Sequence, residues 1–282
     1  LFNVFNQNAM KGIMAIGMTF VIINGYFDMS LCTAVSLTAA LACGLEGSIG
    51  IVPAIIVALL AGTLVGCING VLVAYAKINA FVVTLAMMLG CRGVAYLYHK
   101  EQSIIPNKTD GGWAFIDFGA GKIGQLSYIS IIFIILLLIA HYILKYTTHG
   151  RNTYAVGGNE TSARFSGINI NKIKILVWTI SGAMAGFCGV VLAARMSSGQ
   201  PATGEGYETD AIAAAVLGGT SFFGGTGTVG GLVIGVLIIG IISNGLNLMH
   251  VNSYWQYVLK GVIIIVAVYM DMMKQKRQNA AK

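Results

Sequence analysis

The chain contains six apolar runs that each reach the length of a membrane-spanning helix, which is about 20 residues. Charged residues make up only 10% of the sequence, against roughly a quarter in a typical soluble domain. Together, these features predict a polytopic membrane protein built as an all-α helical bundle. The predicted spans are 50–73, 80–98, 126–145, 173–195, 228–247 and 254–272.

Two further apolar regions are each too short to cross a bilayer as one helix. In the first, the polar stretch 24–30 separates 12–23 from 31–45, and the second covers 209–222. Irregular backbone at membrane depth is tolerated only where protein covers it or where it lines a cavity. Transporters place solute pathways at such broken helices. We therefore expect broken half-helices here, and 12–45 is compatible with one crossing or with two.

Four side chains in or beside these regions are candidates for a solute pathway. Ionisable residues inside a membrane are costly and usually functional, which singles out Asp28 and Asp210, with Ser30 and Tyr207 close to them. Helix capping is the alternative, because a carboxylate just before an apolar helix can bind its free N–H groups. Lys260 lies nearer to a span end, where a lysine can extend its ammonium group to the membrane surface.

The distribution of cations predicts an orientation. Interval 145–174 holds five Lys or Arg residues and one acid, and the tail after 272 is also basic, so both should be cytoplasmic. Interval 99–125 contains three basic and three acidic residues, so it is the segment predicted to lie outside the cell membrane. The chain must then cross an even number of times between spans 173–195 and 254–272, so the short region 209–222 must supply one crossing.

Several motifs are absent or lack their context. There is no GxxxxGK[ST] phosphate loop, no histidine pair with metal-ligand spacing and no CxxC pair, so we expect no catalytic residues, metal site or cofactor. The GxGxxG run at Gly225, Gly227 and Gly230 lacks the strand–helix unit that binds dinucleotides and predicts a tight cytoplasmic loop. The net charge of +7 fits cytoplasmic loops, and we expect no nucleic-acid partner.

Glycines at a spacing of four predict close packing between helices. They occur at Gly62, Gly66 and Gly70, at Gly182 and Gly186, and at Gly231 and Gly235.

The longest polar interval in the second half of the chain is 150–170. A polar loop held between membrane helices is where such a protein meets a soluble partner. Its pattern GRN, AVGGNE, AR and SGI resembles the cytoplasmic loop of monosaccharide ABC importer permeases, the family of the ribose, galactose, xylose and arabinose systems. YETDAIAA at 207–214 with GGTS at 218–221, and SYWQY at 253–257 with Asp271, look like further motifs of that family in the same order.

The resemblance implies one transmembrane permease domain over 1–282, in the inner (plasma) membrane of a bacterium and surrounded by membrane lipid. Its partners would be a second copy of itself, a cytoplasmic ATP-binding cassette subunit and an extracytoplasmic sugar-binding protein. Family members usually carry another N-terminal span, so we expect a truncated start. The loop 150–170 would contain the coupling helix, around 160–166, that contacts the ATPase. The coupling residues would be Gly157, Gly158, Asn159, Glu160, Arg164 and Gly167.

By this resemblance the chain would translocate a monosaccharide of the ribose, galactose or xylose class by alternating access, and a separate subunit would hydrolyse ATP. In this family the polar stretch that corresponds to 24–30 and the residues after it usually have a sequence close to GIDLSVG. This chain has bulkier residues there, namely Tyr26, Phe27, Met29, Leu31 and Cys32. The identity of the transported solute therefore stays open. One alternative is an ABC permease for a nucleoside or another small polar solute. The other is an ion-coupled secondary sugar transporter, which would need ion sites within the spans.

Overall fold

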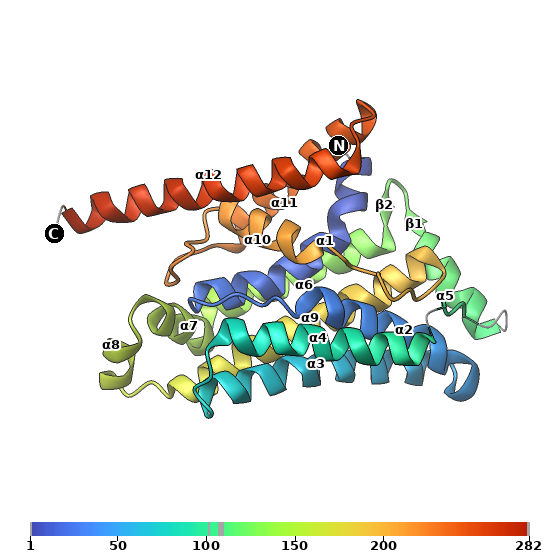
Figure 1. Ribbon diagram of the computed structural model, residues 1–282, viewed down its shortest axis with the longest axis horizontal. Helices are drawn as coiled ribbons and strands as arrows, with labels where there is room; N and C mark the ends of the chain where they lie inside the picture. The colour runs from blue at the N-terminus through green and yellow to red at the C-terminus, as the bar shows by residue number, and fades with distance from the viewer. Residues whose placement is uncertain (1, 101, 107–109, 281–282) are drawn as a thin grey trace.

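The computed structural model describes residues 2–100, 102–106 and 110–280. This part of the chain is almost entirely α-helical, with one short antiparallel hairpin (Figure 1). The elements are α1 Phe2–Ile23, α2 Leu31–Ile49, α3 Ile51–Ala74, α4 Ala80–His99, α5 Asp110–Ala120, β1 Lys122–Ile123, β2 Leu126–Ser127, α6 Tyr128–Tyr146, α7 Thr148–Gly158, α8 Glu160–Phe165, α9 Ile170–Met196, α10 Tyr207–Leu217, α11 Val229–Leu248 and α12 Ser253–Ala280.

Seven of the described helices are long and apolar enough to span a membrane: α2, α3, α4, α6, α9, α11 and the first part of α12. All six predicted spans are among them, so the all-α membrane bundle is confirmed. The seventh is α2, so the expectation that the apolar region 31–45 is too short to cross a bilayer is wrong, because the helix continues to Ile49. Helix α10 has only 11 residues, and at 1.5 Å per residue it is about 16 Å long. Since the hydrocarbon core is about 30 Å thick, α10 is the broken half-helix that the sequence predicts near 209–222.

Helix α1 is longer than predicted, so the expectation that 12–23 forms a short helix of its own is wrong. The helix begins at Phe2 because protein groups bind the polar residues of its first half. The Asn6 carboxamide accepts a hydrogen bond from the Ser127 backbone N–H at 3.0 Å, and Lys11 forms an ion pair that is described below. A polar residue with such a partner does not interrupt a membrane helix.

The two ends of the bundle carry different elements. Helices α7 and α8 and the C-terminal end of α12 lie at one end, whereas α5 and the β-hairpin lie at the other (Figure 1). This is the separation that the cation distribution predicts for 145–174 and 99–125. Helix α1 runs from the α5 end to the α7 end, and α2 returns to the α5 end (Figure 1). Region 12–45 therefore holds the end of one helix and most of a second that runs back.

Helix α9 occupies the centre and packs against α3 through glycines. A Cβ atom on Gly62 would lie 2.8 Å from the Gly182 carbonyl oxygen and from the Gly186 Cα atom, and one on Gly66 would lie 2.9 Å from the Gly182 Cα atom. Real Cβ atoms do not approach that closely, so only glycine allows the two backbones to meet. The close helix packing predicted from the glycine spacing is confirmed for this pair, which we call the α3–α9 spine.

Two segments interrupt the helices. The first break covers residues 24–30, between α1 and α2, and the second break covers residues 218–228, between α10 and α11. The second break contains the GxGxxG glycines Gly225 and Gly227 and lies against α7. It is therefore a tight loop at the α7 end of the bundle, as the sequence predicts.

Candidate functional site

Three segments that are far apart in sequence meet at one point, which we call the break junction and define by Ile23, Gly157 and Gly225. The Gly225 backbone N–H donates a 2.8 Å hydrogen bond to the Ile23 carbonyl, so the second break is joined to the end of α1, directly before the first break. Gly157 of α7 packs on this bond. A Cβ atom at Gly157 would collide with the Ile23 carbonyl oxygen and would lie 2.9 Å from the Gly225 nitrogen. The junction therefore requires glycine at position 157.

Helix α7 makes two further polar contacts with the breaks. The Tyr154 hydroxyl donates a 2.7 Å hydrogen bond to the Gly227 carbonyl of the second break. Burial raises the pKa of Tyr154, so its phenol keeps the proton that it donates. The Asn24 amide group of the first break donates to the Thr153 carbonyl at 3.5 Å. A displacement of α7 must therefore act on both breaks.

Helix α8 is connected to the first break through a buried lysine on α9. The Glu160 carboxylate lies 2.8 Å from the Lys174 ammonium nitrogen, and Lys174 is buried. The same nitrogen lies 5.3 Å from the centre of the Tyr26 ring, which is within the range of a cation–π interaction. Tyr26 in turn packs beside the fully buried Trp178. Glu160 thus contacts the first break through one intermediate residue.

The remaining residues predicted for the coupling loop form and end α8. Asn159 caps the helix, since its side-chain oxygen accepts a 2.8 Å hydrogen bond from the Ser162 N–H. Arg164 is largely exposed, with its guanidinium 3.7 Å from Glu160. Gly167 follows the helix with a φ of +79°, and Gly158 adjoins Gly225.

The interval 150–170 is therefore mostly helical, and the description of it as a loop is wrong: Gly157 and Gly158 end α7. The helix expected over 160–166 is confirmed as α8. The polar composition of 150–158 concealed α7, whose interior contacts are limited to a few buried residues.

Asp28 and Ser30 lie together in a buried polar cluster. One Asp28 oxygen accepts hydrogen bonds from the Ser30 N–H at 3.0 Å and the Ser30 hydroxyl at 2.6 Å, and the other accepts from the Ser181 hydroxyl of α9 at 3.1 Å. The Asn69 amide group of α3 donates to the Ser30 hydroxyl at 2.9 Å. Ser30 is the N-terminal flanking residue of α2, and its own side chain does not cap the helix. Asp28 accepts from the Ser30 N–H at the start of that helix, as a capping carboxylate does, and it also fastens the first break to the α3–α9 spine.

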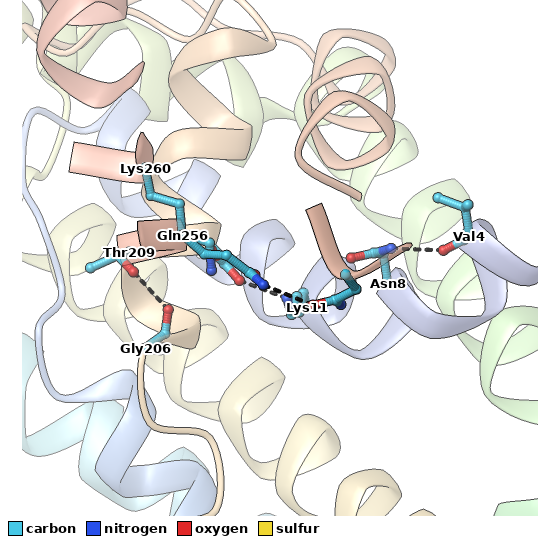
Figure 2. Close-up of polar contacts among 9 residues, drawn as sticks. Val4, Asn8, Lys11, Gly206, Thr209, Gln256 and Lys260 are labelled. Carbon is cyan, nitrogen blue, oxygen red and sulfur yellow. Dashed lines mark hydrogen bonds and ion pairs between the residues drawn. The ribbon is translucent and has the colours of Figure 1, made fainter. Parts of the chain in front are cut away.

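Asp210 lies between two lysines from different helices. Its carboxylate oxygens are each 2.7 Å from an ammonium nitrogen, one of Lys11 on α1 and one of Lys260 on α12. Figure 2 shows the two lysines converging from these helices. Asp210 lies within the first turn of α10, which begins at Tyr207, so the capping alternative, which placed Asp210 before the helix, is wrong. The expectation that Lys260 extends to the membrane surface is also wrong. The Tyr207 ring lies 5.4 Å from the Lys11 nitrogen.

The four predicted pathway residues do not form one site in the structure. They lie in two separate clusters, with two residues in each. Asp28 and Ser30 belong to the first break, whereas Tyr207 and Asp210 belong to the ion cluster of α1, α10 and α12. The sequence analysis missed Lys11 and the roles of Lys174 and Tyr154. A charge inside the apolar run of α1 was the available signal for Lys11, because such a charge needs a partner of opposite sign.

A second contact between the breaks is aromatic. The rings of Phe27 in the first break and Phe222 in the second lie 4.1 Å apart, centre to centre. Asp271 of α12 fixes the second break, because its carboxylate accepts hydrogen bonds from the Phe222 N–H and the Ser221 hydroxyl, both at 2.9 Å. Phe27 is one of the bulky residues by which this first break differs from the family pattern. Its ring contacts the second break.

We expect the substitution Asp210→Asn to destabilise the protein by about 3–5 kcal/mol, because it leaves two poorly exposed ammonium groups without a counter-charge. Thermal unfolding of the purified protein in detergent measures this. Asp117→Asn, on the exposed surface of α5, is the matched control and should have little effect. Replacing the three charged residues together (Lys11→Met, Asp210→Leu, Lys260→Met) should recover most of the loss. Equal stability of Asp210→Asn and the parent would contradict this account.

The neighbouring glycines of α7 offer a second test. Gly157→Ala should destabilise the protein by about 1–3 kcal/mol, because the new Cβ atom forces α7 away from the breaks. Gly158→Ala is the control, since its Cβ atom would have its nearest neighbour, the Gly225 Cα atom, at a comfortable 3.9 Å. Unfolding in detergent compares the two variants. Similar unfolding temperatures would show that the break junction is not tightly packed.

The chain matches the family described as branched-chain amino acid transport system / permease component over residues 1–268. The ribose import permease protein RbsC of Escherichia coli (strain K12) is 44% identical over 277 residues, which cover 98% of this chain and 86% of the relative. The L-arabinose ABC transporter permease protein AraH of Azospirillum brasilense is 36% identical over 272 residues, 96% of this chain and 79% of the relative.

The xylose transport system permease protein XylH of Escherichia coli (strain K12) is 34% identical over 334 aligned positions, 98% of this chain and 85% of the relative. No solved structure matches the chain. Its membrane-spanning helices and these relatives make it a multi-pass protein of the bacterial inner membrane. The chain belongs to the permease-component family of branched-chain amino acid transport systems.

Proposed function

We propose that this chain is the membrane permease subunit of an ATP-driven importer of a monosaccharide, of the class to which ribose, arabinose and xylose belong. Three relatives are named as permeases for these sugars, and each relative aligns with nearly the whole of this chain. Because the sequence identity is highest to the ribose permeases among these relatives, ribose is the first sugar to test.

The observation that carries the mechanism is the break junction. A partner that moves α7 and α8 from the cytoplasmic side would act on both breaks at once, through Gly157 and through the Glu160–Lys174–Tyr26 contact. Broken helices are the places where membrane transporters form their solute pathways. Alternating access then follows from the movement of both breaks relative to the α3–α9 spine.

The partners follow from the class of transporter. An ATP-binding cassette subunit would hydrolyse ATP and bind at the α7–α8 end, and an extracytoplasmic sugar-binding protein would deliver the sugar at the α5 end. The coupling residues are those of α7, α8 and the turn after α8. A second copy of this chain would complete the pore, and lipid would cover the remaining apolar surface.

An ion-coupled secondary transporter is the competing proposal, and the surroundings of Asp210 argue against it. Asp210 is buried and paired with two lysines. Its charge is thus already compensated by the protein, which leaves it no charge for a coupling cation.

A charge swap tests the proposal. Glu160→Lys and Lys174→Glu should each reduce ATP-driven ribose uptake by tenfold or more, because like charges then face each other at the contact between α8 and α9. The double variant restores an ion pair of reversed polarity and should recover much of the uptake. Labelled-sugar uptake into proteoliposomes that also contain the ATP-binding subunit and the sugar-binding protein measures this.

The double variant is also the control for the two single variants, because it carries the same substitutions without the contact between like charges. Membrane abundance is compared for all variants. Uptake that proceeds without the ATP-binding subunit and is abolished by a protonophore would overturn the proposal in favour of a secondary transporter.

A further inference from the structure

A cavity of about 640 Å³ opens at the α7–α8 end of the bundle. Its lining includes Lys77, Ile78 and Asn79 of the connection between α3 and α4, and Glu160 and Arg164 of α8. Tyr26 and Phe27 of the first break also line it. The cavity thus lies between the coupling helix and a second cytoplasmic connection that the sequence analysis did not consider.

The side chains that line this cavity carry a net positive charge. Its lining holds three cations, Lys77, Arg164 and Lys174, and one acid, Glu160. Lys174 and Arg164 share that acid, and within the described residues no carboxylate forms an ion pair with Lys77. A neutral sugar gains little from surplus cations, whereas an acidic segment of a protein gains a complementary surface.

Apolar side chains also face water at this end. Phe165 of α8 is 87% exposed, and Ile78 in the connection is 43% exposed. Both lie in polar segments outside the predicted spans, where lipid tails do not cover them. Exposed apolar groups beside unpaired cations are typical of a surface that a soluble protein covers.

We propose that the α3–α4 connection and α8 together form a docking cleft for an acidic segment, with at least one apolar side chain, of the ATP-binding subunit. This inference rests on the proposed function, because it adds a second contact to the same partner. The partner would then contact two segments of a cleft that Tyr26 and Phe27 of the first break also line. A force between the contacts acts on the first break directly.

Two lysines with matching backbone geometry provide the test. Lys77 has a φ of +54° and lies at the α7–α8 end, whereas Lys100 has a φ of +47° and ends α4 at the opposite end of the bundle. Both are exposed. Lys77→Glu should weaken binding of the cognate ATP-binding subunit about tenfold or more, because a rim cation becomes an anion facing acidic groups. Lys100→Glu should bind it like the parent.

Binding is measured by titrating the purified ATP-binding subunit onto the detergent-solubilised permease at several salt concentrations. The parent should bind less tightly as salt rises, and Lys77→Glu should show a weaker dependence. Thermal unfolding checks that both variants are folded. As a measurement that does not depend on a loss of affinity, Lys77→Cys carrying a photoreactive maleimide should cross-link to the ATP-binding subunit, and Lys100→Cys should not.

The outcomes separate the two claims. If the parent binds the ATP-binding subunit and Lys77→Glu binds it equally well, without cross-links from position 77, the docking cleft is wrong and the proposed function stands. If the parent does not bind that subunit at all, the proposed function itself fails. If ribose protects Lys77→Cys from maleimide while the ATP-binding subunit does not, the cavity is a solute chamber, and the docking inference is overturned.

Discussion

The hydrogen bond between the Gly225 N–H and the Ile23 carbonyl connects the parts of this protein that must act together. A chain that interrupts its helices inside a membrane has to satisfy the exposed backbone groups with protein partners. Here the second break binds the last carbonyl of α1, directly before the first break, and Gly157 of α7 packs on that bond. This contact satisfies backbone groups inside the membrane, and it also connects the second break to α7.

The rest of the structure divides into parts that resist movement and parts that are held by polar contacts. In the α3–α9 spine, glycines bring the backbones of the two helices into direct contact, which leaves little room for rearrangement. By contrast, α12 is fastened by the Lys260–Asp210 ion pair and by Asp271 at the second break. Polar contacts of this kind have alternative partners, so α12 and the breaks are better suited than the spine to change position during a transport cycle.

Apolar length and glycine spacing predicted the spans, the half-helix α10 and the glycine contacts, because these features depend on local pattern. The start of α1 was not predictable in that way, since Lys11 is acceptable in a membrane helix only because Asp210 lies beside it in the fold. Composition also could not distinguish Gly157 from Gly158, which differ only in what surrounds them. The proposed coupling residues were identified through family motifs, whereas the contacts of Lys174 and Tyr154 required the structure.

The central claim is that α7 and the two breaks move as one unit relative to the α3–α9 spine. Spin-label distances in the reconstituted transporter test it, with label pairs at the exposed positions Arg151 and Thr226 and at Leu60 and Thr226. Arg151 lies on α7, Thr226 in the second break and Leu60 on α3. When ATP binds, the account predicts an unchanged Arg151–Thr226 distance and a shifted Leu60–Thr226 distance. A shift of equal size in the Arg151–Thr226 distance would contradict it.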